Sequence, residues 1–453
     1  MDIAVTTVQG AGGRVLLLPF PGMQGHANPM LQLGRRLAYH GLRPTLVLTH
    51  HVLSTTIPTT QCPFPVAAIS DGFDAGGIAS CADTAEYLRR MEAAGSDTLA
   101  RLLLLADDVR VLVYDSHLPW ARRVAREAGV AAAAFFTQMC AVDVVYGEVS
   151  AGRAALPLAD GSALRGRLSV ELGPDDVPPF VAAPAWYPAF TDSALSQFDG
   201  LDQADHVLVN SFRDLEPMEA DYMESIWHAK TVGPTLPSFY LNDDRLPSNK
   251  TYGFNLVSST SPCMAWLDKQ APCSVLLASY GTVANLDTTQ LEELGHGLCN
   301  SGQPFLWVLR SSEADKLPQE LHDECNTKGL IVPFCPQLEV LAHRATGCFL
   351  THCGWNSTTE AIATGVPMIA IPQWADQPTA AKYVESAWRI GLRARRGEKG
   401  LVRREEVERC IKEVMGGKEY MRNASKWMRK AKEAMREGGS SDKNIADFAA
   451  KYL

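Results

Sequence analysis

The sequence has no apolar run long enough to cross a bilayer and no excess of positive charge. Its 453 residues include 42 Lys and Arg against 51 Asp and Glu, which gives a formal net charge of -9. A chain with this balance has no general electrostatic affinity for nucleic acid or anionic lipid. Residues 1–13 also lack the basic and apolar segments of a secretory signal. We therefore expect no nucleic-acid or membrane partner and a cytoplasmic location.

Several motifs that would indicate other chemistries are also missing. The eleven cysteines form no C-x-x-C pair, which argues against a zinc site or a thioredoxin-like centre. There is no Gly-x-Ser-x-Gly elbow of an α/β-hydrolase and no Asp-x-Asp pair for a divalent ion. Gly22 and Gly25 lack the spacing of a dinucleotide fingerprint, and the glycines at 10–13 precede their strand. An NAD-dependent oxidoreductase and a metal-dependent enzyme are both disfavoured.

Apolar strands alternate with helical patterns along most of the chain. The continuous apolar run Val15–Phe20 is typical of a strand buried on both faces of a parallel sheet. A glycine-containing turn follows, and Asn28 and Pro29 read as the N-cap and first residue of a helix. The same order recurs from Val111 onward, with a strand that ends at Asp115. This alternation predicts an α/β fold with doubly wound parallel sheets.

The length of the chain favours two domains, since one core rarely grows this large. A polar, proline-rich stretch between Gly233 and Pro262 interrupts the pattern, and a second α/β series begins at Ser274. In that series, the capping residues Asp287–Gln290 predict a helix start. We predict a first Rossmann-like domain at 1–240, a linker at 241–262, a second Rossmann-like domain at 263–435, and a C-terminal helix at 436–453 that packs back on the first domain.

The segment Thr351–Glu360 has the pattern of an anion site. A strand ends at His352, a glycine turn follows, and a helix begins with several hydrogen-bond donors. The unpaired N–H groups and positive dipole end of such a helix can hold a diphosphate. Ser357 and Glu360 also have the spacing of a capping box, so an ordinary helix start is the alternative on spacing alone.

His26 and Asp115 each follow a predicted strand and form a candidate acid–base pair. A neutral imidazole at His26 can take a proton from an attacking hydroxyl. The Asp115 carboxylate can bind the other ring nitrogen and stabilise the imidazolium. The alternatives are a solvated histidine and a carboxylate that caps the helix beginning near Pro119.

Three stretches together resemble the signature box of plant secondary-product glycosyltransferases, the family 1 UDP-glycosyltransferases. They are Phe334–Gln337, His352–Ser357 and Pro372–Gln377. The Gly22-x-x-Gly25-His26 turn and Tyr114-Asp115 fall where that family has its catalytic pair, so the resemblance spans the chain. It implies a GT-B fold, in which two Rossmann-like domains face each other across a cleft. It also implies UDP-glucose as the donor and no metal.

The same resemblance assigns the donor to the second domain. Phe334 would stack on uracil, where the family usually has Trp, and Glu360 would bind the ribose hydroxyls. The closing Gln377 is the family's usual residue for glucose donors. The remaining donor contacts that the resemblance implies are Cys335 and Gln337 along the base and ribose, His352, Asn356, Ser357 and Thr282 at the phosphates, Asp376 and Gln377 at the sugar, and Trp355 and Thr137 as further contacts.

The first domain would bind a hydroxylated small molecule. By resemblance, the walls of the acceptor pocket would be His117, Leu118, Phe136, Met139 and Gln197. Attack opposite to the departing UDP would invert the anomeric centre and give a β-glucoside. The chain is similar to grass glucosyltransferases that act on trichothecenes such as deoxynivalenol, which implies a sesquiterpenoid alcohol. Flavonoid or phenylpropanoid acceptors, and a non-catalytic UDP-sugar-binding protein, are the alternatives. We expect a monomer.

Overall fold

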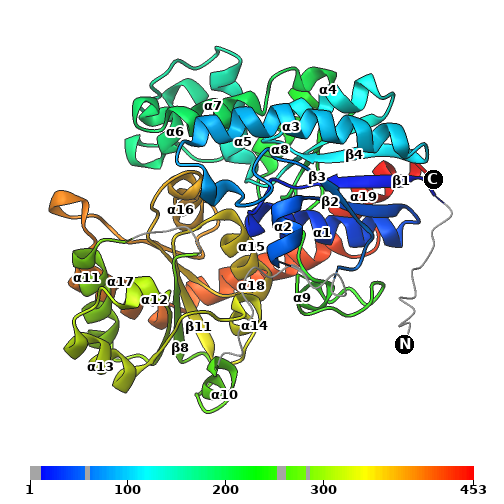
Figure 1. The fold of residues 1–453 in the computed structure, drawn as a ribbon. Coiled ribbons are helices and arrows are strands. Elements are labelled where there is room, and N and C mark those ends of the chain that lie inside the picture. The colour runs from blue at the N-terminus through cyan, green and yellow to red at the C-terminus, as the bar shows by residue number, and fades with distance from the viewer. Residues whose placement is uncertain (1–11, 57–61, 253–261, 282–285) are drawn as a thin grey trace.

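The structure, a computed structural model, describes residues 12–56, 62–252, 262–281 and 286–453. Figure 1 shows two lobes, each built on a parallel sheet with helices on both faces. This confirms the predicted α/β fold. Among these residues, no helix is both long enough and apolar enough to span a bilayer.

The first lobe contains a seven-stranded sheet in the order β3-β2-β1-β4-β5-β6-β7. Its strands are β1 Arg14–Leu18, β2 Arg43–Thr49, β3 Val66–Ile69, β4 Val109–Asp115, β5 Ala131–Phe136, β6 His206–Val209 and β7 Ala229–Thr231. Its helices are α1 Gln24–Tyr39, α2 His50–Thr56, α3 Thr84–Leu105, α4 Pro119–Glu127, α5 Cys140–Ser150, α6 Pro179–Ala182, α7 Pro188–Ser196, α8 Pro217–Trp227 and α9 Ser238–Leu241.

The second lobe contains a six-stranded sheet in the order β10-β9-β8-β11-β12-β13. Its strands are β8 Val275–Ser279, β9 Phe305–Val308, β10 Leu330–Val332, β11 Thr346–Thr351, β12 Met368–Ala370 and β13 Gly391–Arg393. The helices that follow the first lobe are α10 Cys263–Leu267, α11 Thr288–Asn300, α12 Ser311–Ala314, α13 Gln319–Lys328, α14 Gln337–Leu341, α15 Trp355–Thr364, α16 Gln377–Ser386, α17 Arg404–Gly416, α18 Lys418–Met435 and α19 Ser440–Ala450.

Alternate residues of β1 show how the first sheet is covered on both faces. Val15 and Leu17 pack in the cluster formed with α1 and α19, whereas Leu16 and Leu18 pack on the other face with α3, α4 and α5. All four side chains are at most 1% exposed. Because both faces are buried, the strand is a continuous apolar run, as the sequence predicts.

The helix after β1 begins earlier than predicted. Asn28 and Pro29 were expected at its N-terminus, but α1 starts at Gln24 and contains Pro29 in its interior. The backbone N–H groups of His26 and Ala27 already donate to the Met23 carbonyl, at 3.1 and 3.0 Å. Proline lacks an N–H, so the carbonyl four residues before it, at Gly25, has no helical partner from that position.

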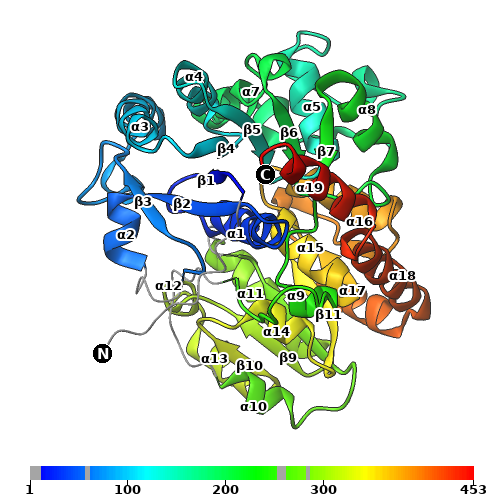
Figure 2. The same cartoon turned by 90° about the vertical axis from the view of Figure 1, so that its right-hand side faces the viewer.

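The C-terminal helix returns to the first lobe. Figure 2 shows α19 beside β7, and the Asn444 amide donates to the Thr231 carbonyl at 2.9 Å. The Ser441 hydroxyl donates to the Gly233 carbonyl at 2.7 Å, and the Gly13 N–H donates to the Tyr452 carbonyl at 2.9 Å. The tail therefore packs on the lobe that the N-terminal half builds, while the exact domain boundaries stay a prediction.

A buried ion cluster joins α1, the chain after α9, and the end of α18. Arg36 of α1 donates to Asp243 at 2.8 Å, and the two side chains are 4% and 3% exposed. Arg245 binds Asp243 at 2.7 Å, Asp442 at 3.0 Å and the Met435 carbonyl at 2.8 Å. Burial raises the pKa of Asp243, but its hydrogen bonds to the two guanidinium groups outweigh this, and its pKa is lowered overall. The cluster ties together the two places where the chain crosses between lobes.

We predict that Asp243→Ala lowers the free energy of unfolding by roughly 3 kcal/mol, since it leaves the buried Arg36 guanidinium without a carboxylate. Urea denaturation monitored by tryptophan fluorescence would measure the change. Asp244→Ala is the matched control, because Asp244 is the exposed neighbour in the chain. Equal stability of the two variants would contradict a structural role for the cluster.

Candidate active site

Three strand ends of the first sheet bring His26, Asp115 and Thr137 together. Asp115 is the last residue of β4, which pairs with β1 on one side and β5 on the other. The His26 Nδ1 atom lies 2.7 Å from Asp115 Oδ2 and 3.2 Å from the Thr137 hydroxyl. A carboxylate only accepts hydrogen bonds, so in the neutral ring Nδ1 carries the proton and Nε2 keeps its lone pair. This is the protonation state that a general base needs.

Burial and charge act in opposite directions on this pair. Burial lowers the pKa of His26, but the Asp115 carboxylate and its hydrogen bond outweigh this, so the pKa is raised above 6.5. Burial raises the pKa of Asp115, but His26 outweighs that and lowers it overall. Asp115 is fully buried and also accepts from the His117 N–H at 3.1 Å. The result is an ionised carboxylate fixed beneath a polarised imidazole.

The second lobe contributes a helix N-terminus whose approach is lined by His352. Burial lowers the pKa of His352 to about 4, which keeps its ring neutral. A Cβ atom added at Gly281 or Gly354 would lie 2.9 or 2.6 Å from the ring, so both glycines are needed for the backbone to approach it. Cys353 adopts a left-handed φ of 65°, which turns the chain sharply into α15. The N–H groups at the start of α15 can hold an anion here.

The N-termini of α1 and α15 meet across the lobes. The Asn356 side-chain amide donates to the Gly25 carbonyl at 2.9 Å. This carbonyl is the one that Pro29 leaves without a helical partner. A Cβ atom at Gly25 would lie 3.3 Å from the Asn356 amide nitrogen, so glycine also permits the close approach. The turn that carries His26 is thereby joined directly to the predicted diphosphate site.

Glu360 is held by two donors from different parts of the chain. The Gln337 amide donates to Glu360 at 2.8 Å and to the Ser357 hydroxyl at 3.0 Å. The Tyr252 hydroxyl donates to the other carboxylate oxygen at 2.8 Å. Burial raises the pKa of Glu360, and both hydrogen bonds oppose that change. Sequence reasoning missed Tyr252, because it lies in the predicted linker and no local motif marks it.

Asp376 and Gln377 begin α16 beside the catalytic pair. Burial raises the pKa of Asp376 to about 6, although backbone hydrogen bonds and attraction to His26 oppose the change. The Gln377 side-chain oxygen accepts from the N–H groups of Gln373 and Trp374, at 2.8 and 3.2 Å. The Gln377 oxygen therefore closes the loop that precedes α16, and among the described residues no hydrogen bond engages its NH₂ group.

Other predicted donor residues lie around this site with differing exposure. Phe334 is half-buried, whereas Cys335 is only 5% exposed, and burial raises the pKa of its thiol. The Trp355 indole N–H donates to the Asn210 carbonyl of the first lobe at 2.7 Å, so its ring serves as an interlobe contact. Thr282 lies outside the described residues.

The predicted acceptor wall is packed into the core. Leu118, Phe136, Met139 and Gln197 are at most 2% exposed. The Gln197 amide accepts from the Ser116 hydroxyl at 2.6 Å and donates to the Ala194 carbonyl at 2.9 Å. His117 is half-buried; its Nδ1 lies 3.1 Å from the Ser193 hydroxyl, and burial lowers its pKa to about 4.

A separate cavity of about 150 Å³ borders the turn that precedes His26. Pro21 and Gly22 form one wall, and α2, the loop after β3 and Tyr87 of α3 form the others. The remaining lining residues are His51, Val52, Thr55, Asp71, Gly77, Ile78 and Ala79. The sequence gives no signal for this cavity, because its residues belong to segments without a motif.

Comparison with known proteins places this geometry in a family. Residues 259–433 match the family model described as UDP-glucoronosyl and UDP-glucosyl transferase. The chain is 67% identical to UDP-glucosyltransferase UGT13248 of Hordeum vulgare subsp. vulgare, covering 100% of this chain and 99% of that protein. A crystal structure of Os79 from O. sativa with UDP superposes with a TM-score of 0.93 at 66% identity, covering 97% of this chain and 100% of that chain.

A second Os79 structure, with UDP and deoxynivalenol-3-glucoside, gives a TM-score of 0.90 at 63% identity, again covering 97% of this chain and 100% of that chain. The likeness therefore extends through both lobes and the cleft between them, which confirms the predicted GT-B fold. The chain belongs to the UDP-glucoronosyl and UDP-glucosyl transferase family and is a glycosyltransferase that uses a UDP-sugar donor.

Proposed function

We propose that the protein is an inverting UDP-glucose-dependent O-glucosyltransferase acting on a hydroxyl of a small lipophilic acceptor, with a trichothecene-like sesquiterpenoid favoured. One observation carries the proposal. Asp115 holds the Nδ1 side of His26 at 2.7 Å, and no hydrogen bond from the described part of the chain engages Nε2. His26, which carries this nitrogen, lies in the first turn of α1, and that turn contacts the N-terminus of α15.

The chemistry follows from this arrangement. The His26 Nε2 atom takes the proton of the acceptor hydroxyl while the oxygen attacks the anomeric carbon of glucose. The bond from that carbon to the UDP oxygen breaks, and the electron pair leaves with UDP. The N–H groups at the start of α15 take up the developing charge. Attack opposite to the leaving group inverts the centre and gives a β-glucoside, while Asp115 stabilises the imidazolium.

The donor contacts follow the same proposal. Glu360, already aimed by Gln337 and Tyr252, would exchange those donors for the ribose hydroxyls. Phe334 would stack on uracil, with Cys335 along the base edge. His352, Trp355, Asn356 and Ser357 line the start of α15, where the diphosphate would lie. Asp376 and Gln377 would bind sugar hydroxyls from the start of α16.

The acceptor class is supported by the relatives. An Os79 structure contains a trichothecene, and another contains deoxynivalenol-3-glucoside. We place the acceptor against His117, Leu118, Phe136, Met139 and Gln197, of which His117 donates its N–H to the Asp115 carboxylate at 3.1 Å.

The proposal also covers the metal dependence, cellular location and oligomeric state of the enzyme. The helix N-terminus at α15 supplies the charge stabilisation that a divalent ion gives other transferases, so we propose a metal-independent reaction. No disulfide joins cysteines in the described part of the chain, which suits the reducing cytoplasm. We propose that the enzyme works there as a monomer.

Purified protein should transfer labelled glucose from UDP-glucose to deoxynivalenol and release UDP. The product should be a β-glucoside by its anomeric proton coupling in NMR, and the rate should be unchanged by excess EDTA. A panel of flavonols and phenylpropanoids tests the acceptor preference. An α-linked product or loss of turnover in EDTA would contradict the mechanism, and preference for the panel compounds would contradict the acceptor assignment.

His26→Ala should lower kcat by about two to four orders of magnitude, because it removes the general base. The affinity for UDP in calorimetry should stay within about twofold of wild type, since UDP binding is assigned to the other lobe. His322→Ala, which removes a histidine on α13, is the matched control and should keep wild-type turnover. A His26→Ala enzyme with most of its activity would remove His26 from the mechanism.

The rate should rise with pH through the pKa of His26 and then level off, because only the neutral ring accepts a proton. Asp115→Asn removes the attraction that raises this pKa and leaves the burial that lowers it. The acid limb of kcat/KM should therefore move to lower pH. The plateau should fall by about two to four orders of magnitude, since the preferred tautomer is lost. An unmoved acid limb would show that His26 does not control it.

A further inference from the structure

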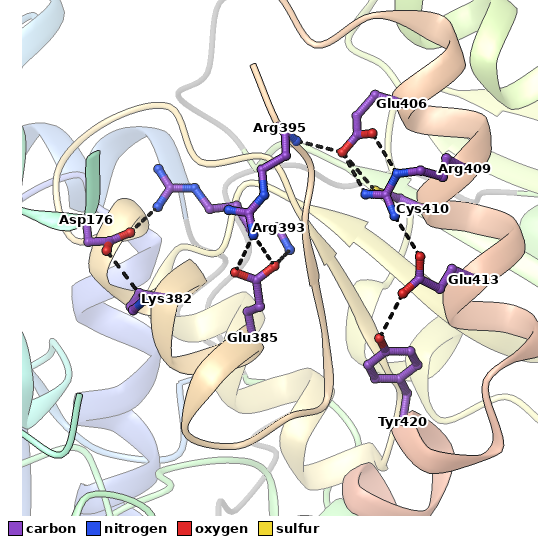
Figure 3. A network of polar contacts seen from close by, with 10 residues as sticks. All are labelled: Asp176, Lys382, Glu385, Arg393, Arg395, Glu406, Arg409, Cys410, Glu413 and Tyr420. Atoms are coloured by element: carbon purple, nitrogen blue, oxygen red, sulfur yellow. Dashed lines mark hydrogen bonds and ion pairs between the residues drawn. The ribbon is translucent and has the colours of Figure 1, made fainter. Parts of the chain in front are cut away.

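The short 3-10 helix η3 Pro174–Asp176 of the first lobe makes a dense set of contacts with the second lobe. Asp176 Oδ1 accepts from the Arg393 guanidinium at 2.6 Å, and these side chains are 13% and 12% exposed. Lys382 Nζ lies 3.8 Å from the other carboxylate oxygen. Figure 3 shows Asp176 between these two cations, one from β13 and one from α16.

Backbone groups of η3 extend the same contact. The Asp176 carbonyl accepts from the Thr379 hydroxyl at 2.7 Å, and the Asp175 carbonyl accepts from Arg393 at 2.7 Å. The Gly173 N–H donates to the Asp176 carboxylate at 2.8 Å, which fixes its rotamer. Thr379 lies in the first turn of α16, two residues after Gln377. The contact therefore acts on the helix whose N-terminus carries the proposed sugar-binding residues.

An aromatic contact holds the loop at residues 374–376, which precedes α16 and ends at the proposed sugar-binding residue Asp376. Trp374 lies two residues before Asp376, and its ring packs edge-on against Phe180 and Phe190 of the first lobe, with ring centroids 5.7 and 5.5 Å apart. Phe180 and Phe190 stack on each other at 5.3 Å. The loop between these contacts contains Ala375 in a left-handed conformation, with φ of 55°. Such a conformation persists only when its surroundings enforce it.

The segment that makes these contacts also reaches the catalytic pair. It continues into α7, where Ser193 lies 3.1 Å from His117, the residue whose N–H binds Asp115. The Thr191 hydroxyl donates to the Phe180 carbonyl at 2.6 Å, which joins α6 to α7. The stretch from η3 to α7 therefore contacts both His117, which binds Asp115, and α16, which carries the proposed sugar-binding residues.

We propose that Asp176 is a positioning residue for the donor sugar. Through Arg393, Lys382 and Thr379 it fixes the start of α16, and so sets where Asp376 and Gln377 meet the glucose hydroxyls relative to His26. It does not touch the uridine side, which Gln337, Tyr252 and Glu360 build from other elements. This inference rests on the proposed function of the same cleft and adds a determinant of sugar recognition.

The test compares binding of UDP, UDP-glucose and UDP-galactose by calorimetry in Asp176→Asn, which keeps the shape and removes the charge. The affinity for UDP should stay within about twofold of wild type. The ratio of the affinity for UDP-glucose to that for UDP should fall about tenfold. The ratio of the affinity for UDP-glucose to that for UDP-galactose should fall by a similar factor. Asp176→Glu, which restores the carboxylate, should recover part of the lost affinity for glucose and part of the preference for glucose over galactose.

Asp214→Asn is the matched control, because Asp214 also pairs across the lobes, with Lys430 of α18 at 3.0 Å, and this ion pair does not involve α16. It should leave the sugar preference unchanged. If Asp176→Asn folds poorly, Phe190→Leu tests the same loop through Trp374. Unchanged sugar preference in Asp176→Asn, or an equal loss for UDP and UDP-glucose, would overturn the proposal. Since binding is measured without turnover, an inactive wild type would contradict the transferase function and not this positioning role.

Discussion

The structure depends on the meeting of two helix N-termini across the cleft. The start of α1 carries His26, the start of α15 carries the predicted diphosphate site, and each has unpaired N–H groups and the positive end of a dipole. Two such ends repel unless something negative or acceptor-like lies between them. In this chain the Gly25 carbonyl takes that place, since it accepts from Asn356 at 2.9 Å. A leaving diphosphate adds negative charge at the point where both helices favour it.

Three carboxylates around the site have pKa values shifted in different directions because their partners differ. Asp115 has an imidazole and a backbone donor, so its pKa is lowered and it stays ionised. Asp376 has backbone donors and a more distant His26, and its pKa rises to about 6. Glu360 has only neutral donors, from Tyr252 and Gln337, and burial raises its pKa. The carboxylate with the lowered pKa lies beneath the base, and the two with raised pKa values lie where ribose and glucose hydroxyls are proposed to bind, which separates proton transfer from ligand binding.

The sequence could predict features that depend on a few neighbouring residues and residues that lie together because they follow the ends of parallel strands. The apolar run of β1, the Asp287 cap that accepts from the Gln290 N–H, and the approach of His26 to Asp115 all follow from patterns within a few residues of each element. The predicted helix start at Asn28 is wrong, because Pro29 is not an N-terminal signal here: it lies inside α1 and leaves the Gly25 carbonyl without a helical partner, so that Asn356 can bind it. Tyr252 and the cavity beside Pro21 arise from contacts between distant segments, which no local pattern encodes.

The interlobe contacts also explain how a site shared by two lobes keeps its geometry. Arg36 lies ten residues after His26 on α1, about 15 Å along the helix axis. The Gly25 contact with Asn356 and the Arg36 contact with Asp243 therefore hold α1 near both of its ends and fix its axis. Two points on one axis leave rotation about it free. The Asp176 contacts with Arg393 of β13 and Lys382 of α16 lie away from α1, so together with the Trp355 contact with Asn210 they oppose this rotation.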